Sequence, residues 1–518
     1  MQSRELERKF DCCCRWKILC KYKRADGEKE IISLKQNQAA MPLFEAMRRY
    51  SEDGALAFHT PGHKQGKGAA PALRSLLTEQ GLRMEVSLMK ELDDLHEPTT
   101  CIKEAQALAA ELYSADESYF VINGTTGAIQ AMIMAAVKPG EKIIVPRNAH
   151  RSIIGGIMLS GAVPVFLQPQ MDVELGIAMG IAAESVRQAI AANKEAKAVL
   201  VINPTYYGVA SDLASIAAMV HQNDMVLLVD EAHGPHLKFS NNLPLSALDA
   251  GADLVAQSTH KILGSLTQTS MLHVQGPRAD RDRLRAMVSL LQSTSPNYLL
   301  LASLDAARWQ MAQAGEDLIG RTVVLADALR QKINGIDGLF CFGRERMDGD
   351  ACFALDVTKL TVNVSGLGLS GPQAEHFLRG ECKIQCELAD LCNVLFIISF
   401  ADGPREADLL LMALRKLAEK KRPDNLKWDL VPLAPLPILR FTPREALYAS
   451  REKVDFLASA GRASAEVLTF YPPGIPVLCP GEIITREIIE YTQRCQRTGL
   501  KVVGPDDASL RTIKVVKQ

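Results

Sequence analysis

Lys261 stands in the stretch STHK, a few residues after an apolar run. Lysine is among the residues least often buried unless its charge is paired, so its place here calls for an explanation. Ionisable side chains also follow two other apolar runs: Asp230 and His233 follow one, and His150 follows another. An amine, a carboxylate and imidazoles are groups that enzymes use as nucleophile, acid and base.

A glycine-rich stretch, NGTTG at 123–127, follows a fourth apolar run. Gly124 permits a tight turn, and Thr125 and Thr126 bring hydroxyls to the start of the next helix. Free N–H groups and the helix dipole favour an anion there, above all a phosphate. The alternative is a glycine turn with a threonine cap. The stretch lacks the lysine of a P-loop and is not G-x-G-x-x-G, which disfavours nucleoside triphosphates and dinucleotides.

The elements that must position these residues alternate along the chain. Strands are expected at 117–123, 142–146, 163–167, 198–204, 224–230 and 253–258, and helices at 125–137, 150–161, 183–193 and 211–222. Beyond residue 276, a further amphipathic helix is expected at 297–313. The alternation of strands and helices predicts an α/β fold with a mainly parallel sheet covered on both faces. Ligands bind such sheets outside the carboxyl ends of the strands, where all the side chains above are expected to meet. Singly, His150 can be a helix cap, Asp230 a turn residue and Lys261 a solvated loop lysine.

Pyridoxal 5′-phosphate (PLP) is the cofactor that needs this set of groups. It requires a lysine for its Schiff base and a carboxylate that keeps the pyridine nitrogen protonated, so that the ring accepts electrons. We assign these roles to Lys261 and Asp230, and the stacking of an aromatic ring on the cofactor to His150. The expected phosphate ligands are Gly124, Thr125, Thr126, Ser258 and His260.

Several longer motifs resemble the ornithine/lysine/arginine decarboxylases among the fold-type-I PLP enzymes. The motifs are FHTPGHKQGKG (58–68), ELDDLHEPTTCIKEAQALAAELY (91–113), NGTTGA (123–128), DEAHG (230–234), STHK (258–261), TPREA (442–446) and SAEVLTFYPPGIPVLCPGE (464–482). The chain is most similar to the shorter bacterial members without an N-terminal wing domain. The resemblance implies that His233 lies near the cofactor ring and the substrate carboxylate, and that Ala232 also borders the cofactor. Lys261 or a histidine of this edge is then expected to return a proton to Cα.

Four regions are expected along the chain. Residues 1–57 form a leader and arm, 58–317 the PLP-binding large domain, 318–422 a small α/β domain, and 423–518 a proline-rich linker and C-terminal domain. The segment STSPNY (293–298) resembles the family segment that reaches the cofactor phosphate of a partner subunit, which implies a homodimer or higher homo-oligomer in which Ser295 crosses the interface. The alternative is a plain turn between two helices.

The expected substrate is a basic amino acid, with arginine first and lysine or ornithine behind. A buried distal cation needs a carboxylate, and the candidates are Glu387, Asp94 and its neighbour Asp93. The alternative for these acids is that they cap helices or lie in water. An aminotransferase or lyase of the same fold stays open, although the run VLFIISFADG (394–403) lacks the arginine that many aminotransferases use. A catalytically silent cofactor-binding protein is a further alternative.

Composition excludes other classes of function. The chain has 518 residues, 23% charged, with a formal net charge of −1, which gives no electrostatic case for nucleic acid or an anionic membrane. No apolar run reaches the about 18 residues needed to span a bilayer, and the N-terminus has no apolar signal segment. We therefore expect a cytoplasmic protein. Twelve cysteines do not suggest a disulfide framework. No metal site is expected, since Cys12, Cys13, Cys14 and Cys20 have no second ligand pair nearby.

Overall fold

The computed structural model describes residues 37–349, 351–422, 435–471, 475–497 and 500–517. The cysteine-rich leader and most of the proline-rich stretch after residue 422 lie outside these ranges. Among the described residues, no helix combines the length and the apolar character that crossing a membrane requires.

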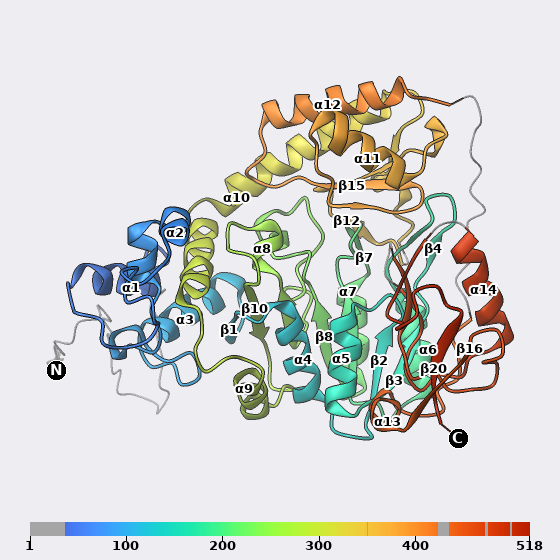
Figure 1. The fold of residues 1–518 in the computed structure, drawn as a ribbon, viewed down its shortest axis with the longest axis horizontal. Coiled ribbons are helices and arrows are strands. Elements are labelled where there is room, and N and C mark those ends of the chain that lie inside the picture. The colour runs from blue at the N-terminus through green and yellow to red at the C-terminus, as the bar shows by residue number, and fades with distance from the viewer. Residues whose placement is uncertain (1–36, 350, 423–434, 472–474, 498–499, 518) are drawn as a thin grey trace, which may run out of the picture.

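A seven-stranded sheet forms the centre of the molecule, in the order β1-β10-β9-β8-β6-β2-β3 (Figure 1). Its strands are β1 (Glu117–Val121), β2 (Lys142–Pro146), β3 (Val163–Leu167), β6 (Ala198–Ile202), β8 (Val226–Asp230), β9 (Leu254–Gln257) and β10 (Ser270–Val274). Neighbours from β9 to β3 run parallel, and β10 runs antiparallel to β9 and β1. The predicted mainly parallel α/β fold is confirmed. Strand β10 is an element that the sequence analysis did not contain.

Helices cover both faces of this sheet. On one face, α4 (Gly124–Ala136), α5 (Arg151–Ser160) and α9 (Arg281–Leu290) pack in one hydrophobic cluster with the sheet. On the other, α3 (Cys101–Tyr113), α6 (Ala183–Ala192), α7 (Leu213–Gln222) and the first part of α10 (Tyr298–Asn334) form a second cluster. Because both faces are buried, the central strands are continuous apolar runs. The N-terminal helix α1 (Pro42–Glu52) packs against α3 and α10 (Figure 1). Helix α2 (Pro71–Met84) contacts α1 and α10, and the short η1 (Lys90–Leu92) contacts α1.

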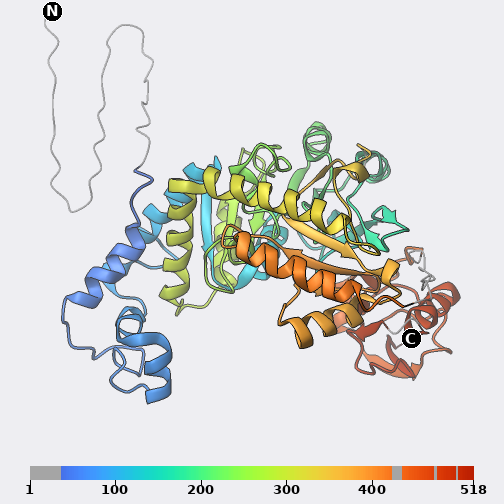
Figure 2. The same ribbon diagram turned by 90° about the horizontal axis from the view of Figure 1, so that it is seen from above.

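A smaller antiparallel sheet has the order β11-β13-β15-β14. Its strands are β11 (Phe340–Cys341), β13 (Lys359–Asn363), β14 (Leu388–Ala389) and β15 (Asn393–Ile397), covered by α11 (Gly371–Cys382) and α12 (Pro404–Ala418). Figure 2 shows α12 beside the second half of α10, where Ala326 and Ile333 share a core with Leu414. Helix α10 has 37 residues and runs without a break from the large sheet to the small one. The predicted helix at 297–313 is thus longer than expected, and the boundary at 317/318 falls inside it.

Short elements complete the described chain. Two-stranded pairings join β4 (Met171–Asp172) to β5 (Ile177–Ala178), and β7 (Val209–Ala210) to β12 (Ala354–Leu355). The second pairing joins the segment that follows β6 of the large sheet to the segment that precedes β13 of the small sheet. Near the C-terminus are α13 (Pro443–Tyr448), the pair β16 (Arg451–Asp455) with β20 (Thr512–Val516), the sheet of β17 (Leu468–Tyr471), β18 (Pro476–Leu478) and β19 (Lys501–Val503), and α14 (Arg486–Arg497). The single turns are η2 (Leu237–Phe239), η3 (Arg344–Arg346), η4 (Ser365–Leu367) and α8 (Thr259–Ile262).

Candidate active site

The carboxyl ends of the central strands bring three of the predicted residues together. Asp230 is the last residue of β8 and is 4% exposed, and His233 lies three residues later in the loop that follows. Lys261 sits on α8, directly after β9, and its Nζ lies 2.8 Å from Nε2 of His233. Since β8 and β9 are adjacent and parallel, their loops must leave the sheet at the same edge.

Burial sets the protonation of this group. It lowers the pKa of Lys261 from its usual value, although the carboxylates of Asp230 and Glu387 oppose the shift. It also raises the pKa of Asp230, against the charges of His150 and Lys261. The pKa of His233 is held well below its usual range by burial, and the neighbouring charge of Lys261 acts in the same direction. An amine with a lowered pKa is available as a neutral nucleophile and as a partner in proton transfer.

The start of α4 offers the predicted anion site. Gly124 has φ +66°, and its N–H is bonded to the carbonyl of Gln268. Asn123 makes no capping side-chain bond, and Thr126 is exposed at the same end. The Thr125 side chain is buried, with Oγ1 2.5 Å from Oγ of Ser258. This contact between the hydroxyls of Thr125 and Ser258 connects the start of α4 to the end of β9.

His150 and His260 each have one ring nitrogen already bonded. Nδ1 of His150 lies 2.8 Å from Oγ of Ser152 and accepts the Ser152 N–H, so this residue caps α5. Burial lowers the pKa of His150, and the carboxylate of Asp230 opposes that shift. Nδ1 of His260 lies 2.7 Å from the carbonyl of Thr269, which holds its ring beside β10. The capping alternative for His150 is therefore observed.

Glu387 reaches this edge from the small sheet. It directly precedes β14, and Oε1 accepts a hydrogen bond of 2.5 Å from the hydroxyl of Tyr206. The Tyr206 ring lies 4.4 Å from that of His233, centroid to centroid, and 5.8 Å from Nζ of Lys261. The sequence analysis missed Tyr206, although NPTYYG follows β6 and the rule of strand ends applies to it as well.

Two comparisons with known proteins bear on this arrangement. The sequence model of the Orn/Lys/Arg decarboxylase major domain matches residues 41–406, and that of the C-terminal domain of the same family matches residues 436–505. The chain belongs to the Orn/Lys/Arg decarboxylase family. Every motif that carried the resemblance lies within one of these two matches.

Individual relatives in this family are similar over most of their length. An arginine decarboxylase of Halalkalibacterium halodurans is 48% identical, over 93% of this chain and 98% of its own. One of Bacillus subtilis is 44% identical, over 93% and 99%. Among solved structures, the lysine decarboxylase of Francisella novicida has a TM-score of 0.81 at 24% identity, covering 92% of this chain and 81% of that one. An alanine–glyoxylate aminotransferase of Nostoc, with a TM-score of 0.52 at 18% identity, shares the fold more distantly.

Three predicted residues of this family member lie outside the cluster around Lys261. Asp93 is buried and caps α3: it accepts the N–H groups of Thr99 and Thr100 just before the helix and that of Ile102 in its first turn. This is the capping alternative. Asp94 is exposed and accepts the N–H of His96. Ser295 is exposed in the loop between α9 and α10, as an interface residue would be in a single chain.

Proposed function

We propose that the protein is a PLP-dependent decarboxylase that converts L-arginine to agmatine and CO2. The observation that carries the proposal is the amine–imidazole contact of Lys261 and His233 beside Asp230, in a chain 48% identical to an arginine decarboxylase. The solved relatives at comparable coverage are lysine decarboxylases, so lysine and ornithine are the competing substrates.

The residues at this edge fit PLP. Nδ1 of His233 is buried without a hydrogen-bond partner in the described part of the chain, and the start of α4 has no side-chain cap. Buried polar atoms are normally hydrogen-bonded, so Nδ1 of His233 is available to a bound group. Lys261 would hold the aldehyde, Asp230 the ring nitrogen and His150 the ring face. Ala232 and His233 would border the ring, and the phosphate would be held by Gly124, Thr125, Thr126, Ser258 and His260. Bound PLP supplies a protonated ring that accepts the electron pair released when CO2 leaves.

The chain's own residues provide orientation and protons. A carboxylate leaves when its bond to Cα stands perpendicular to the cofactor ring, so the site must fix the substrate's rotation. His233 can bind the α-carboxylate on one side, and Glu387 can bind the distal cation on the other. The pKa of Lys261 is lowered and its Nζ lies 2.8 Å from Nε2 of His233, so a proton can pass between the amine and the imidazole, and either can return it to Cα.

Product identification tests the proposed function. The purified protein with PLP is incubated separately with arginine, lysine and ornithine, and the amines are identified by mass spectrometry. We expect agmatine from arginine, and neither product nor borohydride-fixed PLP in a Lys261→Ala variant. Cadaverine or putrescine without agmatine would overturn the choice of arginine, and no amine from any of the three would overturn the decarboxylase.

Glu387 is the proposed anchor for the guanidinium group. A Glu387→Gln variant should raise the KM for arginine at least about tenfold with a much smaller change in kcat, because the lost ion pair is made equally in ground state and transition state. Glu381→Gln is the matched control, since Glu381 is an exposed acid of the same small domain, on α11. An unchanged KM in the Glu387 variant would place the anchor elsewhere, with Asp94 the next candidate.

We also propose a homodimer in which Ser295 contributes to the partner's site. Support comes from large apolar side chains that a single chain leaves uncovered: Phe58 is 91% exposed, and Leu56 and Leu76 are exposed in the same N-terminal region. Apolar surface of this kind commonly marks an interface.

A further inference from the structure

A cluster of buried charges lies behind His233, and the site described so far does not use it. Lys359, the first residue of β13, and Asp356, in the turn before it, are both almost fully buried, as is His236 in the loop after β8. Nζ of Lys359 donates to Oδ2 of Asp356 at 2.6 Å, and Nε2 of His236 lies 3.1 Å from the same oxygen. We call these three residues the charged hub.

The charged hub holds the His233 loop at both ends. Nζ of Lys359 also donates to the carbonyl of His233 at 3.2 Å, while Asp356 binds the ring of His236 three residues later. Between them, Gly234 is packed so closely that an added Cβ would lie 2.7 Å from Cγ of Glu231. The backbone that carries the His233 ring is therefore attached to the small sheet on one side and to β8 on the other.

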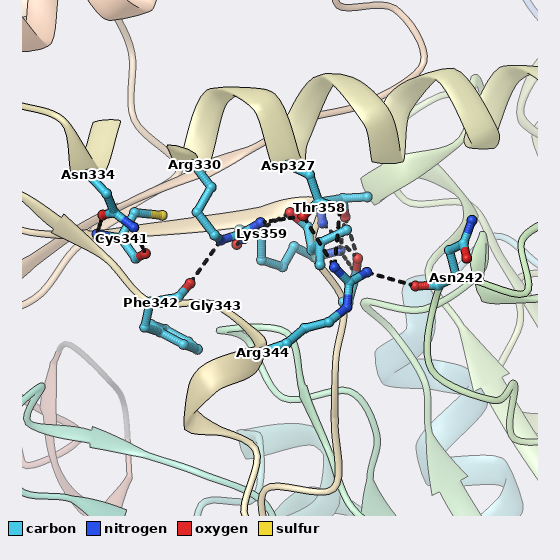
Figure 3. A network of polar contacts seen from close by, with 12 residues as sticks. Asn242, Asp327, Arg330, Asn334, Cys341, Phe342, Gly343, Arg344, Thr358 and Lys359 are labelled. Carbon is cyan, nitrogen blue, oxygen red and sulfur yellow. Dashed lines mark hydrogen bonds and ion pairs between the residues drawn. The ribbon is translucent and has the colours of Figure 1, made fainter. Parts of the chain in front are cut away.

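Helix α10 fixes the charged hub in turn. Arg330 donates to the carbonyls of Lys359 and Val357, each at 3.0 Å, and to that of Phe342 at 2.9 Å. Figure 3 shows Lys359 and Thr358 beneath the helix that carries Arg330 and Asp327. Asp327 also binds Arg344, which donates to the carbonyl of Asn242 near the large sheet. The network thus spans the junction between the two sheets.

We propose that Lys359 and Asp356 are positioning residues that, through the His233 loop, hold the His233 imidazole against the amine of Lys261. This inference rests on the proposed function for the role of His233. Removing two charges from water is expensive, and a buried ion pair is weak evidence for stability alone. Lys359 and Asp356 bind the loop that carries a reacting imidazole, so they can serve the reaction rate by holding that ring in place. Small misplacements of reacting groups lower reaction rates by large factors.

A double-mutant cycle in kcat tests whether Lys359 acts through His233. His233→Gln should lower kcat on the order of 100-fold, the usual scale for an acid–base residue. Lys359→Met should lower kcat about tenfold or more in the native background and have little further effect in the His233→Gln background, since residues in one network are non-additive. Equal losses in both backgrounds would overturn the proposal.

A matched control separates positioning from loss of stability. Arg308 and Asp305 form an equally buried pair at the same i,i+3 spacing, but they hold the N-terminal segment through Leu43 and Ala40. Arg308→Met should lower the melting temperature and leave kcat nearly unchanged. A loss of kcat equal to that of Lys359→Met would count against positioning. If Lys359→Met does not fold, Lys359→Met/Asp356→Asn removes both charges together and carries the same expectation.

Hydrogen–deuterium exchange of the full chain gives a readout that needs no turnover. The peptide covering 231–239 should exchange faster in Lys359→Met and at the native rate in Arg308→Met. Unchanged exchange in Lys359→Met would overturn the proposal even if the protein decarboxylates arginine. Faster exchange without decarboxylation of any basic amino acid would support the charged hub and reject the proposed function.

Discussion

Glu231 is a buried acid next to Asp230 that takes no part in the proposed chemistry. It accepts the N–H of Ala247 and the amide of Gln257, each at 2.7 Å, and it is 0% exposed. Burial raises its pKa from 4.5 to about 8. The folded protein therefore keeps this carboxyl protonated at neutral pH, one residue from a carboxylate that the proposed mechanism needs ionised.

The raised pKa of Glu231 predicts a dependence of stability on pH. The native state binds a proton that the unfolded state releases, so this group's contribution is fully present below pH 4.5 and is lost as pH rises to about 8. The slope is about 1.4 kcal/mol per pH unit. A Glu231→Gln variant should thus gain stability relative to the native protein across this window, measured as the difference in melting temperature at successive pH values. A difference that stays constant from pH 4.5 to 8 would contradict the assignment.

At the scale of residues, the sequence was sufficient to place the candidate site residues that follow closely after a predicted strand. Lys261, Asp230 and His233 lie at one edge because β8 and β9 are parallel, and the alternation of strands and helices predicts that parallel arrangement. Lys359 could not be found in this way. Its burial depends on a turn of the small sheet packing against the loop after β8, which no local pattern of the sequence records.

At the scale of elements, Arg147 connects the end of β2 to the C-terminal region. It is buried and pairs with Glu482, with Nη2 to Oε2 at 2.8 Å, and it donates to the carbonyls of Pro476 and Val477. Since His150 follows three residues later, this contact fixes the chain just before a predicted cofactor residue. The C-terminal region is thus part of the support for the active-site edge.

Breaking this pair should destabilise the protein strongly. Glu482→Gln leaves the Arg147 charge buried without its partner, at a cost of about 3–5 kcal/mol. Arg462 and Glu452 form a more exposed pair in the same C-terminal region, so Glu452→Gln should cost at most about 1 kcal/mol. Circular dichroism melting of both variants measures the difference. Equal melting temperatures would show that the buried pair does not secure the C-terminal region.

Two elements show where patterns of the sequence were insufficient. Strand β10 follows a loop of hydroxylated residues and lies between β9 and β1, and β1 is distant in the sequence, so its place in the sheet depends on contacts far along the chain. Helix α10 continues past Gln313 because its later turns pack against α12 of the small sheet. Both are cases in which tertiary packing decides the extent of an element.

At the scale of the whole molecule, the structure shows which residue should be changed to test whether two subunits share their active sites. Tyr298, in the same STSPNY segment as Ser295, is 0% exposed and donates its hydroxyl to the carbonyl of Asp93 in its own chain. It belongs to the core of its own subunit, which leaves exposed Ser295 as the residue to change. A Ser295→Glu substitution would bring a negative charge toward the partner's phosphate, and like charges repel.

Hybrid dimers then test whether active sites are shared. Lys261→Ala and Ser295→Glu proteins should each be nearly inactive, because one lacks the amine and the other carries the repelling charge. In an equal mixture after subunit exchange, half of the dimers are hybrids and each has one intact site, so about a quarter of native activity should return. The measurement is agmatine formation, with exchange verified by mass spectrometry of differently tagged subunits. Full exchange without recovered activity would show that each subunit forms its site alone, and an active Ser295→Glu protein would remove Ser295 from the site.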